Sequence, residues 1–317
     1  MAICLSASLA LKAQPPTFTR RACLLGAPLA FAPLLARADS SNGILRLPAP
    51  ERLVAVGDLH GDCTAFERVL SLAGLYEPSR GWTGGSAVLV QIGDILDRGD
   101  EELRLFELLR TLKTEAAAAG GRVISLLGNH EVLNAVGISV EASSKSAAAF
   151  DDRSSAFRVG SEFAAELAAW PVACVVGDTA FVHAGLTLSH VSGLGAASAA
   201  AAEWLRGGRA VPPDLLWPSS RLSQRSPLWM RDLSDPPGTE PPPAACADLQ
   251  QALQALGAKR LVVGHTVQPC INAACGGGIV RIDVGLSAAM RNAPPQALEV
   301  LRDGRVRVLT ERGVLAV

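Results

Sequence analysis

The sequence lacks three features, and each absence excludes a class of protein. It has no basic run, and its 29 lysines and arginines are balanced by 30 acidic residues, so the electrostatic footprint of a nucleic-acid binder is missing. Its cysteines show no paired C-x-x-C spacing, which argues against a structural zinc site. The one long apolar stretch away from a core pattern, residues 22–36, is too short to span a bilayer comfortably. We therefore expect no nucleic-acid partner and no stable membrane insertion for this chain of 317 residues, which is long enough for one large α/β domain or two smaller ones.

The first 38 residues have the composition of a targeting leader. No acidic residue occurs before Asp39, and the small-residue tripeptide 36–38 offers a cleavage site behind the apolar stretch. The pair Arg20-Arg21 resembles a twin-arginine export signal, and an Ala/Ser-rich segment precedes it. Two addresses in tandem favour a chloroplast protein with a transit peptide that is sent on to the thylakoid lumen. A bacterial periplasmic protein and a disordered tail with a chance Arg-Arg pair are the alternatives.

Five cysteines follow the leader, an odd number. Cys270 and Cys275 are close enough in sequence to form a bridge in an oxidising compartment, and a pair of reduced buried thiols is the alternative. No pairing is predicted for the other three.

The chain after the leader begins with a βαβαβ pattern. Strands are expected at 52–57, 87–92 and 123–127, with helices at 63–73 and 101–118 between them. The second strand is largely apolar, as strands covered on both faces are. The pattern implies parallel strands with right-handed crossovers, and it places ligands at the carboxyl ends of the strands.

The second half is less regular and predicts a second sheet packed on the first. Residues 135–153 are polar and small, which indicates a loop or mobile cover, and residues 155–168 are expected to form a helix. The remaining elements are a hairpin at 172–176 and 179–182, helices at 196–205 and 248–256, a strand at 260–263 and short strands from 279 to 317. The long Pro-rich segment Val211 to Pro243 lies among them, and a loop of this length is usually functional or disordered.

Polar residues beside glycine follow the predicted strands. Gly57-Asp58-Leu59-His60-Gly61 follows the first strand, and residues i and i+2 of an extended segment point the same way. A single Gly-Asp is usually a turn and a single histidine usually a surface residue. Four of the five histidines, however, occupy such positions. We therefore collect these donors as candidate metal ligands: Asp58, His60, Asp94, Asn129, His183 and His265.

Three histidines, two carboxylates and an amide suit Mn²⁺, Fe or Zn²⁺ better than Mg²⁺ or Ca²⁺. The number of ligands implies two ions, with Asp94 shared between them. The other ligands are Asp58 and His60 at one ion, and Asn129, His183 and His265 at the second. Two ions roughly 3.5–4 Å apart would activate a water and hold the oxygens of an in-line displacement at phosphorus. The sequence therefore predicts hydrolysis of phosphate esters, with Mn²⁺ as the first metal to test.

The motifs G-D-x-H-G, G-D-x-x-D-R-G and G-N-H-E, at residues 57–61, 93–99 and 128–131, resemble those of the calcineurin-like metallophosphoesterases, and more narrowly of the phosphoprotein phosphatases. His183-Ala184-Gly185 and Gly264-His265 complete the set. The Ser-Ala-Pro-Asn-Tyr signature of the conventional eukaryotic enzymes is absent, and the chain is similar to the bacterial-type branch called Shewanella-like phosphatases, which has a chloroplast subgroup. The resemblance implies an α/β fold, a central β-sandwich flanked by helices in four αββα layers, for a catalytic domain over residues 51–317.

The resemblance also assigns roles to individual residues. His130 would be the general acid that protonates the leaving oxygen, with Asp97 setting its orientation. The residues that grip the phosphoryl oxygens would be Arg98, Arg231 and Asn129. For Arg231 an exposed loop arginine is the alternative, and Glu131 is expected to be a structural partner of an arginine.

These observations predict a dinuclear-metal phosphomonoesterase that acts on phosphoserine or phosphothreonine of phosphoproteins. Among enzymes, the alternatives are a phosphotyrosine phosphatase, which needs a deeper apolar pocket, and a hydrolase of small substrates such as diadenosine tetraphosphate. A non-catalytic binding module on the same fold is the alternative of another class. Its usual sign is a lost metal ligand, and none of the six is lost here.

Overall fold

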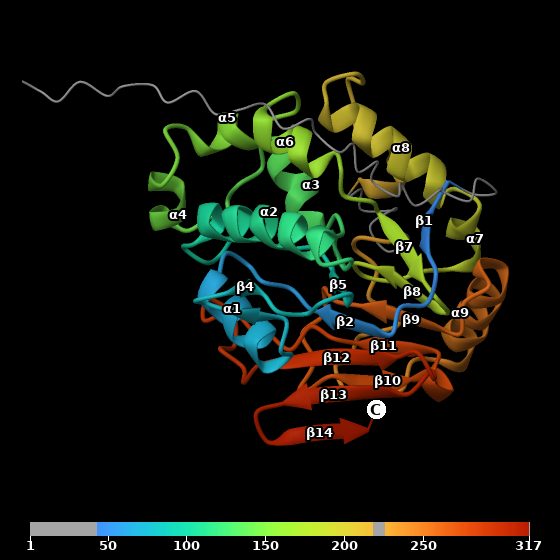
Figure 1. Ribbon diagram of the computed structural model, residues 1–317. Helices are drawn as coiled ribbons and strands as arrows, with labels where there is room; N and C mark the ends of the chain where they lie inside the picture. Colours follow the sequence, from blue (N-terminus) through green and yellow to red (C-terminus); the bar gives the residue numbers. More distant parts are fainter. Residues whose placement is uncertain (1–42, 218–225, 317) are drawn as a thin grey trace, which may run out of the picture. The chain divides into compact units, whose positions relative to one another are not determined.

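The computed structural model describes residues 43–217 and 226–316, and the expected leader at 1–38 lies outside the described residues. The described chain contains two six-stranded sheets with helices around them (Figure 1). The first sheet has the strand order β14 (Gly313–Ala316), β13 (Val306–Thr310), β12 (Gln296–Leu301), β2 (Arg52–Val56), β5 (Val88–Gln91) and β6 (Arg122–Ser125). The second has the order β1 (Leu45–Leu47), β7 (Ala173–Val176), β8 (Thr179–Val182), β9 (Arg260–Val263), β11 (Ile279–Arg281) and β10 (Asn272–Ala274). A short ribbon pairs β3 (Tyr76–Glu77) with β4 (Gly81–Trp82).

The predicted βαβαβ unit is confirmed in the first sheet. β2, β5 and β6 are parallel, with Val54 beside Leu89 and Leu89 beside Val123. Helix α1 (Cys63–Leu72) connects the first two strands and α2 (Glu102–Ala118) the next two. β12 continues the sheet antiparallel to β2. Because the three strands are parallel, their carboxyl ends lie at one edge of the sheet, where the residues that follow them meet.

The predicted hairpin and the second sheet are also confirmed. β7 and β8 are antiparallel neighbours, while β8, β9 and β11 run parallel. The residues that follow β8 and β9 therefore leave this sheet at one edge. Two multi-stranded sheets flanked by helices agree with the fold class predicted from the motifs.

The helices bury apolar faces against the sheets. In α1 the side chains of Phe66, Val69 and Leu70 are fully buried, and Asp62 caps the helix by accepting the Ala65 N–H at 2.8 Å. Helix α2 packs on β6, and α8 (Leu194–Leu205) packs on β7. Helix α7 (Leu188–Val191) packs on α9 (Pro243–Leu256). No helix within the described ranges is long and apolar enough to cross a membrane.

The predicted single helix over residues 155–168 is wrong. The chain forms α5 (Arg153–Phe157) and α6 (Glu162–Leu167), because Gly160 adopts a left-handed conformation and Ser161 then caps a new helix by accepting the Ala164 N–H. The polar segment before it is not a plain loop either, since it holds the end of α3 (Asn129–Ala135) and α4 (Ser144–Ala148). Aromatic rings join these short helices to α2: Phe106 contacts Phe157, Phe163 and Trp170.

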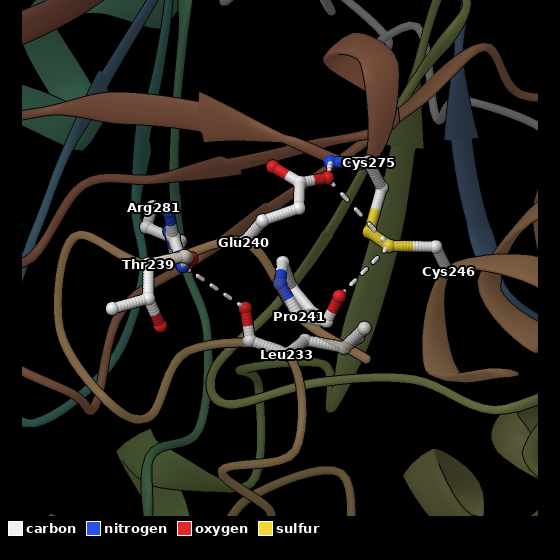
Figure 2. The surroundings of a disulfide bond; sticks show 7 residues. All are labelled: Leu233, Thr239, Glu240, Pro241, Cys246, Cys275 and Arg281. Carbon is white, nitrogen blue, oxygen red and sulfur yellow. Dashed lines mark hydrogen bonds between the residues drawn. A yellow bond between two sulfur atoms is a disulfide. The ribbon is translucent and has the colours of Figure 1, made fainter. Parts of the chain in front are cut away.

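The disulfide of the described chain joins Cys246 to Cys275 (Figure 2). Cys270 is free and exposed. Both interpretations left open for Cys270 and Cys275, a bridge between them and a pair of reduced buried thiols, are therefore wrong. β10 runs between these two cysteines and pairs antiparallel with β11, so Cys275 lies at the turn that meets α9 rather than beside Cys270. Glu240 fixes the same junction by accepting the Cys275 N–H at 2.6 Å.

Candidate metal centre

The six candidate ligands all follow strands and come from both sheets. Asp58 and His60 follow β2, Asp94 follows β5, and Asn129 begins α3 directly behind β6. His183 follows β8 and His265 follows β9 in the second sheet. The first five side chains are almost completely buried. The structure therefore brings the predicted residues together where the ends of the two sheets face each other.

Asp94 is shared between two groups of ligand atoms. One group consists of Asp94, His183 and His265, and the other of Asp94, His60 and His130, with the ligand atoms of each group within 4.8 Å of one another. The Oδ2 atom of Asp94 lies 3.3 Å from Nε2 of His183 and 3.9 Å from Nε2 of His60. The first group matches the predicted second metal site. Asn129 adjoins it, because its Oδ1 atom is 3.0 Å from Nε2 of His183.

Asp58 is not a member of either group but lies beside them. It accepts the backbone N–H of His265, with oxygen distances of 3.3 and 3.1 Å, so it also ties the two sheets together. In the group around His60 the third member is His130 rather than Asp58. Burial raises the pKa of Asp58 most, and the carboxylates of Asp283 and Asp94 raise it further. Asp58 therefore belongs to the same charged cluster as Asp94.

Each of the three histidine ligands is oriented by a backbone carbonyl. Nδ1 of His60 donates to the Leu96 carbonyl at 3.1 Å, and Nδ1 of His183 donates to the Ile92 carbonyl at 2.9 Å. Nε2 of His265 lies 3.2 Å from the Trp229 carbonyl. A carbonyl only accepts, so the bonded nitrogen carries a proton and the other ring nitrogen is the one that a metal ion can bind. This is the arrangement that metal-bound histidines adopt.

The electrostatics of the cluster fit divalent cations. Burial lowers the pKa of His60 to about 4 and that of His265 well below its usual range, so both imidazoles are neutral donors. Burial raises the pKa of three carboxyl groups: that of Asp58, that of Asp283, to about 6, and that of Glu131, to about 7. Neighbouring carboxylates add to each of these shifts. Crowded buried carboxylates beside neutral imidazoles are the donor set of a transition-metal site, where a cation offsets their repulsion.

The backbone at the strand ends explains why glycine flanks the ligands. A Cβ atom at Gly128 would collide with the Asp94 carboxylate, and one at Gly264 would collide with that of Asp58. Several site residues also adopt left-handed backbone conformations, among them His60, Asp94 and His265 with φ of 41°, 53° and 65°. The tight turns therefore aim consecutive side chains at one point.

His130 and Asp97 form the predicted pair. The Nδ1 atom of His130 lies 2.6 Å from Oδ2 of Asp97, and Asn134 donates to the same oxygen at 2.9 Å. Burial alone would lower the pKa of His130, but Asp94 and Asp97 together raise it. The Nε2 atom, on the other side of the ring, lies 3.9 Å from Asp94. Its side chain lines the cavity described next.

A cavity of about 490 Å³ opens over this centre and is lined by His60, Asp94, His130 and His265. Both predicted phosphate-gripping arginines line it as well. Arg231 reaches it from the Pro-rich segment and donates to Thr266 Oγ1 at 2.9 Å and to the His265 carbonyl at 3.2 Å. Arg231 is exposed and lies outside the helices and strands, so the structure has it both in a loop and at the cavity.

The chain matches the model of the calcineurin-like phosphoesterase family over residues 51–269. The chain belongs to the calcineurin-like phosphoesterase family. This is a hydrolase family whose members use two divalent metal ions.

Within the calcineurin-like phosphoesterases, the chain is similar to two named phosphatases. It is 34% identical to Shewanella-like protein phosphatase 2 of Arabidopsis thaliana, over 86% of this chain and 81% of that protein. It is 31% identical to Shewanella-like protein phosphatase 1 of Plasmodium berghei, over 74% of this chain and 67% of that protein. Among solved structures, a cold-active protein tyrosine phosphatase superposes with a TM-score of 0.72 at 20% identity, over 87% of this chain and 81% of that one. At that identity the likeness shows the fold.

In this calcineurin-like phosphoesterase the role predicted for Glu131 is wrong. Glu131 pairs with no arginine of the described residues: its carboxylate accepts four backbone N–H groups, from Gly128, Asp94, Ile95 and Leu96. It thereby joins the loops behind β5 and β6. The prediction failed because these N–H groups converge only once the left-handed turn at Asp94 has formed.

The sequence reading also missed Arg153 and Asp283. Arg153 pairs with Asp97 and Glu102, but it stands in a polar segment with no motif. Asp283 lines the cavity, and it stands outside the motifs at residues 57–61, 93–99 and 128–131.

Proposed function

We propose that this chain hydrolyses phosphate monoesters on proteins, at phosphoserine or phosphothreonine. The reaction would use two divalent metal ions, with Mn²⁺ as the favoured metal. The observation that carries the proposal is the meeting, at one cavity, of two ligand groups that share Asp94, an oriented His130 and two arginines. Two relatives at 34% and 31% identity are named protein phosphatases, which supports a protein substrate.

The metal ions would be held by the six strand-end ligands: Asp58, His60, Asp94, Asn129, His183 and His265. When bound, the ions would supply Lewis-acid activation of water and neutralise charge on the phosphoryl oxygens. Both sheets contribute ligands, so the centre can form only when the sheets are packed together.

The chain's own residues bind the phosphoryl group. Arg98 and Arg231 bring two permanent positive charges to the cavity, and a guanidinium donates to phosphoryl oxygens through a planar fork. Asn129 also lines this cavity. Its Oδ1 faces His183, which leaves its Nδ2 donor for a phosphoryl oxygen.

His130 would protonate the leaving oxygen. Its Nδ1 lies 2.6 Å from Oδ2 of Asp97, which fixes the ring and leaves Nε2 as the nitrogen that can give a proton to a substrate in the cavity that His130 lines. An alkoxide such as that of serine is a poor leaving group, so protonation there supports the proposed substrate class.

Phosphotyrosine is the second candidate substrate, and one observation favours it. Part of the cavity wall is apolar, formed by the side chains of Leu133, Trp229, Pro237, Val267 and Met290. Such a wall would pack against an aromatic leaving group.

Three peptides of one sequence, phosphorylated at serine, threonine or tyrosine, test the proposal on the full chain with added Mn²⁺. We expect the phosphoserine and phosphothreonine peptides to be hydrolysed fastest, with activity lost on chelation and in Asp94→Asn and His130→Asn. Asp303→Asn, in an exposed turn, is the matched control and keeps wild-type activity. A phosphotyrosine preference would select the second candidate. Metal binding without turnover of any peptide would refute both and favour a small-molecule hydrolase or a binding module.

A further inference from the structure

A buried arginine lies behind the Asp97–His130 pair. Arg153, the first residue of α5, is 5% exposed. Its Nε atom donates to Glu102 at 2.9 Å, and its two terminal nitrogens donate to Asn134 Oδ1 at 2.6 Å and to Asp97 Oδ1 at 2.8 Å. A further bond of 2.5 Å joins it to Glu102. Every nitrogen of this guanidinium therefore has an anionic or amide partner.

The partners of Arg153 are the groups that hold the predicted acid. Asp97 gives one carboxylate oxygen to Arg153 and the other to His130 Nδ1. Asn134 accepts from Arg153 and donates to the His130 side of Asp97. Glu102 accepts the backbone N–H of Asp97 at 2.6 Å. The network thus holds both carboxylate oxygens of Asp97, through Arg153 and Asn134, and its backbone N–H, through Glu102.

Stability alone does not account for such a group. A buried ion pair is weak evidence for net stabilisation, because removing the charges from water offsets their attraction. What a fully satisfied buried network does provide is a single geometry. Here that geometry ends at the imidazole of His130, a residue that lines the cavity and whose Nε2 atom lies 3.9 Å from Asp94 Oδ2.

We propose that Arg153 is a positioning residue for His130: it locks the Asp97 carboxylate so that the imidazole keeps Nε2 aimed at the leaving oxygen. The inference rests on the proposed function, because it concerns the proton that His130 gives to the leaving group. Without the guanidinium, one oxygen of Asp97 loses its partner and the carboxylate can turn away from the ring. A displacement of about 1 Å can reduce a rate by as much as 10²-fold.

The test uses two substrates that differ in their need for a proton. The alkoxide of a phosphoserine peptide must be protonated as it leaves, whereas p-nitrophenolate leaves readily without a proton. For Arg153→Met we expect kcat on the phosphoserine peptide to fall by about tenfold or more, and kcat on p-nitrophenyl phosphate to fall much less. KM should stay near the wild-type value for both. Equal losses on both substrates, or a change confined to KM, would overturn the inference.

Three further variants separate positioning from general damage. Arg110→Met removes a surface arginine that pairs with Glu166, and it should leave both rates unchanged. In a His130→Asn background, Arg153→Met should cause no further loss on the peptide, since both act on one step. A full additional loss there would contradict the proposal. Glu102→Gln loosens the same link without removing the arginine, should show the same substrate pattern, and replaces Arg153→Met if that variant does not fold.

A readout independent of turnover distinguishes this inference from the proposed function. The strongly hydrogen-bonded Nδ1 proton of His130 should give a downfield proton resonance that is absent in His130→Asn. We expect the signal to be lost or broadened in Arg153→Met and kept in Arg110→Met. A wild type that hydrolyses neither substrate would refute the proposed function, while an unchanged signal in Arg153→Met would refute the positioning role.

Discussion

Removing the disulfide should destabilise the chain by an amount that follows from the size of its loop. Cys246 and Cys275 are 29 residues apart in sequence. In the chain-entropy model a cross-link of this span stabilises the folded state by roughly 3.5 kcal/mol, between the values for loops of about 15 and 100 residues. For a domain of this size the loss corresponds to a decrease in Tm of roughly 7–14 °C.

The double variant Cys246→Ser/Cys275→Ser measures this loss of stability directly. Its unfolding in urea is monitored by circular dichroism. The native contacts at the junction remain, because Glu240 still accepts the backbone N–H of residue 275 and Arg281 still donates to the Thr239 carbonyl at 2.8 Å (Figure 2). The loss should therefore act mainly through the unfolded chain.

Cys270→Ser is the matched control, since Cys270 is free and exposed. It should change the free energy of unfolding by less than about 0.5 kcal/mol. The reasoning is refuted if the double variant is as stable as an oxidised wild type whose bridge has been verified by mass spectrometry. A Cys270→Ser variant as unstable as the double variant would show that the pairing is different.

Three other perturbations have defined outcomes. Chelation should lower Tm, because ions that bind only the folded state stabilise it by about 2.7 kcal/mol at 100 times Kd, and Asp94→Asn should abolish the gain on adding Mn²⁺. Phe106→Ala should lower the free energy of unfolding by about 3–5 kcal/mol, since this fully buried ring contacts three other aromatic rings. Burial alone would raise the pKa of Glu299, but Arg307 and Arg52 hold it below its usual value of 4.5. The stability that Glu299 supplies is therefore complete above about pH 4.5 and is lost as the pH falls through the lower folded-state pKa, which urea titrations of wild type and Glu299→Gln would reveal.

Each of these has a control. An Asp303→Asn variant should gain the same Tm on adding Mn²⁺ as the wild type, and a gain that survives in Asp94→Asn would contradict the shared-ligand assignment. Val140→Ala, at an exposed side chain, should stay within about 0.5 kcal/mol of wild type, in contrast to Phe106→Ala. A Glu299→Gln variant that loses stability at acid pH as steeply as the wild type would refute the assignment to that carboxylate.

The centre could be predicted from the sequence because the end of a strand is recognisable locally, and its position in a parallel sheet determines which residues meet. Parallel strands end at one edge of a sheet, so residues directly behind β2, β5 and β6 had to meet once the βαβαβ pattern was recognised. Glycines beside Asp58, Asp94 and Asn129 marked the turns.

The supporting network could not be predicted in this way. Arg153 lies 56 residues from Asp97 and 51 from Glu102, and no periodicity or spacing links them. The four N–H partners of Glu131 depend on the path of a turn rather than on residue types, and the partner of Cys275 depends on how α9 meets the turn between β10 and β11. Contacts of this kind are properties of the assembled fold.

The left-handed turns of the centre also bear on how this chain could change over time. Of the seven non-glycine residues with positive φ in the described ranges, five are predicted site residues: His60, Asp94, Asp97, Arg98 and His265. Each such residue is less stable there than glycine by roughly 1–2 kcal/mol, so together they approach the whole net stability of a typical domain, about 5–15 kcal/mol. A descendant released from its reaction would gain stability by drifting to glycine or asparagine at these turns. These five positions therefore distinguish lineages that keep the chemistry from those that keep only the fold.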